Sequence, residues 1–228
     1  MLVSVGTFNL NNLFSRWNFS GAIEEIEAGT DPVGAVTIRY EFTDADTYWL
    51  RTFRGRLVEA KPTADTQRIA GRINAMDLDV LAVQEVESAS LLHDLARALH
   101  ALCGFSYTIS HRESADSRGI DVALLSDPRR TAVTAVALRR ACTSVETEVL
   151  DPALACPQGE MPLFSRPPLE VSLLVDGQPL TVWVTHFKSK RGGAAETAAR
   201  RLAQARYVNE LAQSALRADP DARLMLLG

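Results

Sequence analysis

Four apolar runs that each deliver a polar side chain constrain this chain more than any other feature. They follow one another as VGTFNLNNLF (5–14), LDVLAVQEVES (78–88), SRGIDVALLS (117–126) and LTVWVTHFKSKRGG (180–193). The polar groups at or near their ends are Asn9, Glu85, Asp121 and His186. Strand ends that carry single polar groups are how α/β proteins assemble a site from distant parts of the chain. The four runs therefore predict one shared site.

The composition is typical of a single soluble globular domain. The 228 residues are 46% hydrophobic and 23% charged, which is ordinary for such a domain. The net charge of −4 argues against binding nucleic acid by bulk electrostatics alone, although a metal could recruit phosphate locally. No apolar run approaches the roughly 18 residues of a membrane span, and no signal peptide is recognisable. As given, the chain is expected to be cytoplasmic, with an exported parent protein left open.

Helix and strand patterns alternate along the chain. Apolar spacing predicts helices at 63–76, 88–102 and 194–216. It predicts strands at 2–9, 79–84, 105–110, 120–126, 131–138, 169–175, 180–187 and 223–227. The polar segment 15–62 is interpreted as an insert with two β-like runs, at 35–42 and 48–53. Hairpins mixed with crossover helices indicate an α/β protein, and periodicity alone leaves a sandwich and an open sheet both open.

Two of the predicted helices have a regular apolar repeat. In the helix at 88–102 the repeat consists of Leu91, Leu95, Leu99 and Leu102. In the helix at 194–216 it consists of Ala198, Leu202, Ala205, Val208, Leu211, Ala212 and Ala215. Such spacing places the repeated residues on one helix face, which is expected to be the packed one.

The chain resembles the endonuclease/exonuclease/phosphatase superfamily, and within it the bacterial extracellular-nuclease-like branch. The resemblance is carried by FNLNNLF (8–14), LAVQEVE (81–87), RGIDVALL (118–125) and THFKSKRGG (185–193). Any one of these motifs is weak, but four in the family's order argue against coincidence. The resemblance implies the deoxyribonuclease I-like fold, a two-sheet β-sandwich flanked by helices in four α-β-β-α layers. It also implies a Mg²⁺ or Mn²⁺ cofactor.

The resemblance assigns metal binding to Glu85 and Asn9. Phosphodiester hydrolysis needs charge neutralisation at the phosphoryl group, which Mg²⁺ or Mn²⁺ can supply, and these cations prefer oxygen ligands. Glu85 stands where the family keeps its principal metal carboxylate, and Asn9 where an amide holds the metal or orients the phosphate. The alternatives are a solvated strand-end glutamate and a turn-forming asparagine. Asn11 stands where relatives often carry a carboxylate, and Asn12 is expected to shape the turn.

The fourth motif supplies the expected phosphate contacts. The resemblance gives His186 a contact with the scissile phosphate or a role in proton transfer, against the alternative of a structural histidine. Lys188 and Arg191 are expected to bind substrate phosphate, helped by amides of the helix that follows. A solvated basic loop is the alternative for both.

Asp121 lies inside an apolar strand, where a carboxylate needs a partner. It would orient His186 or pair with Arg118, and a purely structural ion pair stays equally open. The histidines without ligand spacing are expected at the surface: His93, His100 and His111.

The resemblance further implies a single domain, residues 1–228, that is truncated at its C-terminus. In the family a Gly-Asp-x-Asn strand end follows the long helix, and an Asp-His segment closes the domain. Gly228 would be the Gly of the first motif. We therefore expect this chain to be weakly active or inactive by itself.

The three cysteines have no zinc-binding spacing. Cys142 and Cys156 could pair across a loop in an oxidising compartment, and free thiols are equally open.

Three functions are compatible with these residues. The favoured one is a Mg²⁺-dependent phosphodiesterase, a DNA endonuclease when intact, with nucleic acid as its partner. The second acts on a lipid or small-molecule phosphoester, which the acidic charge keeps open. The third is a non-catalytic or degenerate domain. No protein partner is evident from the sequence.

Overall fold

The computed structural model describes most of the chain. The described residues are 2–13, 17–20, 56–59, 61–114, 116, 119–147, 149, 151, 153–190 and 193–228. The two β-like runs expected at 35–42 and 48–53 lie outside the described residues, as do Arg118 and Arg191.

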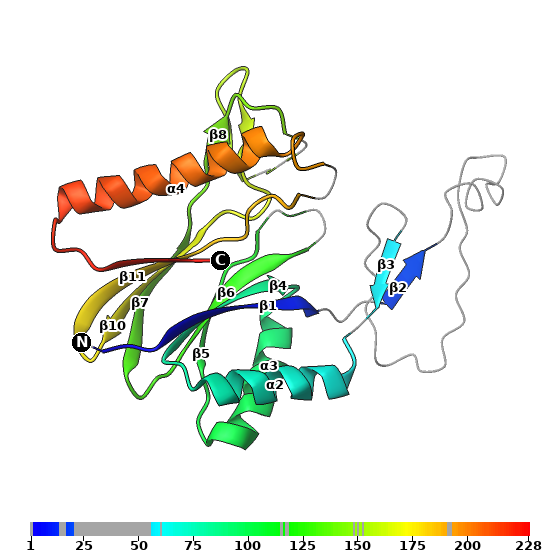
Figure 1. Ribbon diagram of the computed structural model, residues 1–228, viewed down its shortest axis with the longest axis vertical. Helices are drawn as coiled ribbons and strands as arrows, with labels where there is room; N and C mark the ends of the chain where they lie inside the picture. Colours follow the sequence, from blue (N-terminus) through cyan, green and yellow to red (C-terminus); the bar gives the residue numbers. More distant parts are fainter. Residues whose placement is uncertain are drawn as a thin grey trace.

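Two four-stranded sheets form the centre of the molecule (Figure 1). The first has the order β1-β4-β6-β5, made of Val5–Leu13, Val80–Val86, Asp121–Ser126 and Thr108–His111. The second has the order β12-β11-β10-β7, made of Leu224–Leu227, Gln178–Val184, Leu169–Val175 and Thr131–Leu138. β1 runs parallel to β4 and β11 parallel to β12. The other neighbours within these two sheets are antiparallel.

Helices lie on the outer sides of both sheets. α2 (Thr63–Met76) and α3 (Ala89–Cys103) lie against the first sheet, and α4 (Ala198–Ala218) lies beside the second (Figure 1). This layering confirms the predicted α/β sandwich. The two apolar sheet faces turn toward each other and leave their outer faces for helices, which the strand periodicity alone could not specify.

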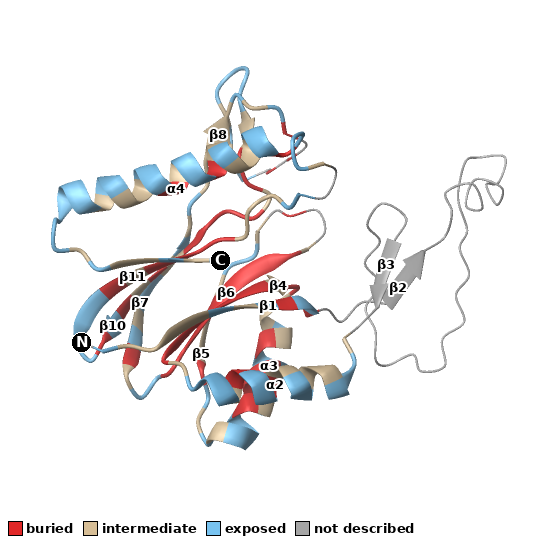
Figure 2. Ribbon diagram, in the orientation of Figure 1, coloured by how far each residue is buried: buried red, intermediate tan, exposed pale blue. Residues whose placement is uncertain are grey.

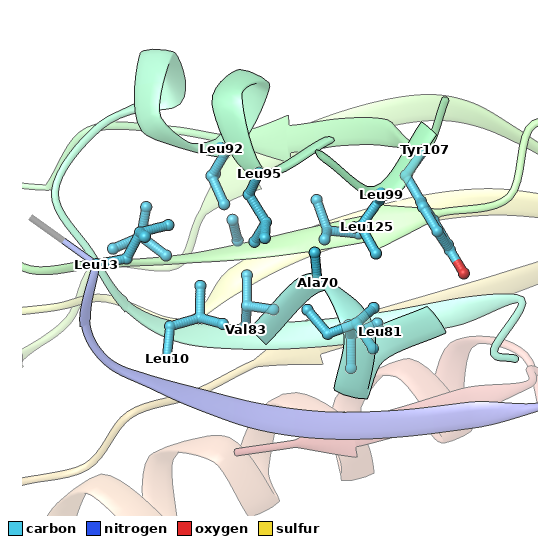
Figure 3. Close-up of a cluster of buried hydrophobic side chains, with 13 residues drawn as sticks. Leu10, Leu13, Ala70, Leu81, Val83, Leu92, Leu95, Leu99, Tyr107 and Leu125 are labelled. Carbon is cyan, nitrogen blue, oxygen red and sulfur yellow. The ribbon is translucent and has the colours of Figure 1, made fainter. Parts of the chain in front are cut away.

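The strand β4 divides the interior into two cores because it is buried on both faces. Successive strand residues point to opposite sides. Val80 and Ala82 therefore join the core between the sheets, while Leu81 and Val83 join the cluster beneath α2 and α3. Figure 3 shows this helix-side cluster, with Leu95 of α3 close to the sheet. Burying one such aliphatic side chain contributes roughly 1.5–3 kcal/mol.

The chain makes a Pro-rich excursion between β7 and β10, residues 139–168. Inside this excursion β8 (Cys142–Thr143) pairs with β9 (Met161–Pro162). A disulfide joins Cys142 to Cys156, while Cys103 is a free thiol. The structure thus has the bonded form, where the sequence had left a disulfide and free thiols both open.

The predicted insert 15–62 is closed at its base by a small sheet. β2 (Trp17–Ser20) pairs antiparallel with β3 (Arg56–Glu59). Both backbone ends of the insert therefore meet before α2 begins. None of the described helices has the length and apolarity of a transmembrane span.

The buried face of α4 includes Val208 of the predicted repeat but otherwise differs from the predicted one. The residues that α4 buries are Gln204 and Val208, whereas Leu202 is 51% exposed. Figure 2 shows α4 exposed along much of its length. The helix packs against Leu163 and Phe164 of the excursion, and this partner selects a face that contains a glutamine. The helix also begins at Ala198, four residues later than predicted.

Candidate active site

The strand ends of the first sheet bring three of the predicted polar groups to one edge. Asn9 of β1 lies opposite Gln84 of β4 in a parallel pair. β6 runs the other way and begins at Asp121, opposite Val86. The end of β1, the end of β4 and the start of β6 therefore share this edge.

Glu85 occupies an unusual backbone position at the end of β4. Its φ angle is 63°, in the left-handed region, and the pairing of β4 with β6 shifts register between Gln84 and Val86. The carboxylate accepts hydrogen bonds from Asn9 Nδ2 and from the Asn12 backbone N–H, both at 3.0 Å. A strained backbone that aims a side chain in this way is characteristic of functional sites.

The three asparagines in the second half of β1 bend the strand into a turn around this carboxylate. Asn9 Oδ1 accepts a hydrogen bond from the Asn11 backbone N–H at 2.7 Å. Asn11 and Asn12 have φ angles of 50° and 60°. Asparagine tolerates the left-handed region better than most residues. The FNLNN sequence thus folds locally into a turn that points two donors at Glu85.

His186 reaches the same cluster from the second sheet. It follows β11 by two residues, and its Nε2 lies 3.8 Å from Glu85 Oε1. This separation is too long for a hydrogen bond. The histidine and glutamate side chains keep 19% and 22% of their surface exposed. The pair therefore lies where the two sheets meet and can still be reached from solvent.

Lys61, two residues before the start of α2, adds a cation near this cluster. Burial lowers the pKa of Lys61, and the nearby Glu85 carboxylate opposes this by raising it, so that the pKa stays below its ordinary value. The sequence motifs did not single out this residue.

The segment after His186 is held by α4. The Lys188 backbone N–H donates to Gln204 Oε1 at 2.9 Å, and Gln204 Nε2 donates to the Leu163 carbonyl at 3.1 Å. The predicted phosphate ligand Lys188 thus sits two residues beyond His186 on an anchored segment. Arg191, the other predicted phosphate ligand, lies outside the described residues.

Asp121 is engaged with partners on its own sheet. Its Oδ2 lies 3.0 Å from His111 Nε2, and its Oδ1 accepts from the Ser114 backbone N–H at 3.0 Å. The His111 and Asp121 side chains are 6% and 5% exposed. The expectation that His111 is a surface residue was wrong, because β5 places it beside the start of β6.

Two further buried charges link the two halves of the sandwich near this edge. Arg166 Nε lies 3.8 Å from Asp116 Oδ2, with side chains 5% and 2% exposed. Asp116 precedes β6, while Arg166 belongs to the excursion. An ion pair so deeply buried holds both segments, since either charge alone would be costly there.

The family model of the endonuclease/exonuclease/phosphatase family matches residues 65–228. The chain belongs to this family. The superfamily prediction is thereby confirmed, and Glu85, Asp121 and His186 fall inside the matched residues, while Asn9 precedes them. No curated protein matches the chain significantly.

Several solved structures are similar to the chain. TDP2 from Caenorhabditis elegans, in a truncated form, has 17% identity and a TM-score of 0.49, covering 70% of this chain and 51% of its own. D. rerio TDP2 complexed with a single-strand DNA product has 17% identity and a TM-score of 0.45, covering 72% and 52%. ANGEL2, a 2',3'-cyclic phosphatase, has 20% identity and a TM-score of 0.35, covering 53% and 31%. The chain therefore spans about half or less of these structures.

Glu85 and Asn9 fit the protein's share of the divalent-metal site that the family implies. Both offer oxygen atoms, which Mg²⁺ and Mn²⁺ prefer, and the two N–H donors fix the carboxylate's orientation. Mg²⁺ commonly keeps several waters and binds one or two carboxylates together with substrate phosphate. Among the described residues, no group of three or more His, Cys, Asp or Glu side chains forms a fuller cage.

Sequence reasoning missed three residues that lie near the site or hold its segments in place: Lys61, Gln204 and Arg166. Lys61 had a usable signal, because it is one of only three lysines and the other two lie in the fourth motif. Gln204 and Arg166 had none, since their roles depend on contacts with segments far away in the sequence.

Proposed function

We propose that this chain carries the catalytic edge of a divalent-metal-dependent phosphodiester hydrolase that cleaves DNA. The observation that supports the proposal most directly is the cluster around Glu85. A strand-end carboxylate is oriented by Asn9 and by the Asn12 amide, and His186 approaches it from the other sheet to 3.8 Å. The narrower assignment to the bacterial extracellular-nuclease-like branch is part of this proposal.

In this proposal each residue has a distinct task. Glu85 and Asn9 hold Mg²⁺ or Mn²⁺ through their oxygen atoms. When bound, the cation supplies charge neutralisation at the phosphoryl group and at the leaving oxygen. His186 Nε2 donates a hydrogen bond to the phosphate or a proton to the departing oxygen.

The remaining predicted residues bind the substrate phosphate or hold the local structure. The Lys188 and Arg191 side chains bind the phosphate as cations. Asp121 was the candidate carboxylate for orienting His186, but it is engaged by His111 and Ser114, and in this proposal its role is structural. A lipid or small-molecule phosphoester is the alternative substrate for the same edge.

Metal binding is tested without relying on activity. A Mn²⁺ titration followed by electron paramagnetic resonance should give a weaker dissociation constant for Glu85→Gln than for the unchanged protein, by about tenfold or more. Glu160→Gln is the matched control, because Glu160 is an exposed glutamate in the turn before β9. Equal Mn²⁺ affinity in all three proteins would contradict metal binding at Glu85.

Activity is tested with supercoiled plasmid in the presence of Mg²⁺ or EDTA. Plasmid nicking by the unchanged protein should be weak and should require the metal, and His186→Asn should lower kcat by about 100-fold or more. Release of a lipid headgroup without plasmid nicking would favour the alternative substrate. Metal-independent nicking, or no hydrolysis of either substrate, would count against the proposal.

A further inference from the structure

A basic cleft lies beside the candidate active site, between β1 and α2. It has a volume of about 280 Å³ and is lined by Phe8, Asn9, Leu10, Asn11, Lys61, Asp65, Arg68, Ile69 and Arg72. Figure 1 shows α2 alongside β1. The cleft shares Asn9 and Asn11 with the turn around Glu85, so it continues the active-site edge.

The charges in this cleft come from one face of α2. Asp65, Arg68 and Arg72 are spaced three and four residues apart, which places them on the same side of a helix. Lys61 precedes Asp65 by four residues, just before the helix begins. Three cations and one carboxylate thus line the cleft, although the whole chain carries a net charge of −4. A local positive cleft on an acidic protein attracts anions to that place.

The two arginines are available for an anionic ligand. Arg68 pairs with Asp65 three residues earlier, and the Arg68 side chain is 76% exposed. Such an exposed pair is weak and yields readily to a phosphate, which accepts two parallel hydrogen bonds from a guanidinium. Within the described part of the chain, no hydrogen bond or ion pair involves the Arg72 side chain.

Part of the cleft lining is apolar, and the sugar rings of a nucleotide chain can pack against it while the phosphates meet the cations. Phe8 and Ile69 line the cleft and also pack against the helix-side core. The cleft thus combines apolar groups, three cations, and two asparagines of the candidate active site. A helix face that is merely exposed to solvent would not be expected to have this combination.

We propose that this cleft binds a backbone phosphate of a nucleic-acid strand next to the scissile one, with Arg68 and Arg72 as its ligands. The inference depends on the proposed function only for the position of the scissile phosphate. It adds a second anchoring point, which a substrate with a single phosphoester lacks. The cleft therefore favours extended nucleic-acid strands over small phosphoesters.

The first test measures binding without catalysis. Fluorescence anisotropy of a labelled single-stranded oligonucleotide in EDTA should show about tenfold weaker binding for Arg68→Gln/Arg72→Gln, and the dependence of log affinity on log salt should become shallower by about one to two. The control is Arg97→Gln/Arg206→Gln, which makes the same change in net charge. Arg97 pairs with Asp94 three residues earlier and is 77% exposed, much like Arg68. Equal affinity and equal salt dependence in the two double variants would contradict phosphate binding by Arg68 and Arg72 in this cleft.

The second test separates the cleft from the catalytic edge. Hydrolysis of bis(4-nitrophenyl) phosphate, a diester without a neighbouring phosphate, should stay within about twofold in Arg68→Gln/Arg72→Gln, while KM for the oligonucleotide rises. An equal loss on both substrates would overturn the inference, because it would mean that the arginines support the catalytic geometry instead. If the unchanged protein hydrolyses neither substrate, the proposed function fails. Oligonucleotide binding in EDTA then still shows whether the cleft binds a nucleic-acid strand.

Discussion

The buried side chain of Gln204 ties two segments of the site together, accepting from the Lys188 backbone N–H at 2.9 Å and donating to the Leu163 carbonyl at 3.1 Å. Gln204 is 2% exposed. Lys188 lies two residues after His186, and Leu163 belongs to the disulfide-closed excursion. A single amide on α4 therefore sets the position of the segment that carries the proposed phosphate ligands.

Replacing Gln204 with Met should weaken substrate binding. Methionine fills a similar volume but leaves the Lys188 N–H without its Gln204 partner, and an unsatisfied buried group costs about 1–3 kcal/mol. The Leu163 carbonyl keeps the hydrogen bond from Arg200 Nε at 3.3 Å. We expect lower stability in urea denaturation and a severalfold higher KM for the phosphodiester substrate, with a smaller change in kcat.

Val208→Ala is the matched control for Gln204→Met. Val208 is buried one helical turn later, in a cluster with Leu163 and Phe164, but its side chain cannot form a hydrogen bond to the Lys188 segment. It should lose stability without the rise in KM. An equal rise in KM for both variants would mean that Gln204 has only a structural role.

Asp121→Asn should act mainly on stability. The Asp121 carboxylate is 5% exposed and is already engaged by His111 and Ser114. Losing its charge weakens these hydrogen bonds, at a cost of about 1–3 kcal/mol. Turnover per folded molecule is expected to stay within about twofold. A fall in kcat at unchanged stability would instead support the role of orienting His186.

Removing the disulfide should destabilise the protein. Cys142 and Cys156 are separated by 14 residues, and closing a loop of this length contributes about 3 kcal/mol in the chain-entropy description. Urea denaturation of Cys142→Ser/Cys156→Ser is expected to show this loss. A reducing agent should destabilise the unchanged protein to the same extent and leave the double variant unaffected. Sensitivity of the double variant to reducing agent would contradict this account.

Glu170 should make stability depend on pH in the acidic range. Burial by itself raises the pKa of Glu170, but hydrogen bonds from Arg139 and Trp183 outweigh it and hold the pKa below the ordinary 4.5. A carboxyl with a lowered folded pKa contributes stability above its unfolded pKa and loses it as pH falls through the folded value.

Comparison with Glu170→Gln measures this contribution. The substitution should cost about 1–3 kcal/mol at pH 7, since it replaces charge-assisted hydrogen bonds. The difference in free energy of unfolding between the two proteins should shrink as pH falls below 4.5. A constant difference from pH 7 to pH 3 would show that the charge of Glu170 is not responsible.

Local sequence patterns predicted most of the elements because they depend on neighbouring residues. α2 and the strands β7 and β10 have the predicted bounds. β4 was recognisable because a strand buried on both faces is a continuous apolar run. The candidate site was predictable to the same degree: each polar group stands at the end of such a run, and the edge holds Asn9, Glu85 and His186 together.

The sequence by itself determined most of the elements, the family and the strand-end residues, because local periodicity and motif order record them directly. Only the tertiary structure decided which residues of each predicted helix face are buried. Leu102 of α3 is 53% exposed although it continues the apolar repeat, whereas Gln204 is buried because two distant backbone groups satisfy its amide. It also decided that Asp121 meets His111, and that Lys61, Arg68 and Arg72 line one cleft with Asn9. These outcomes depend on contacts between segments far apart in the chain, which no local pattern of residues encodes.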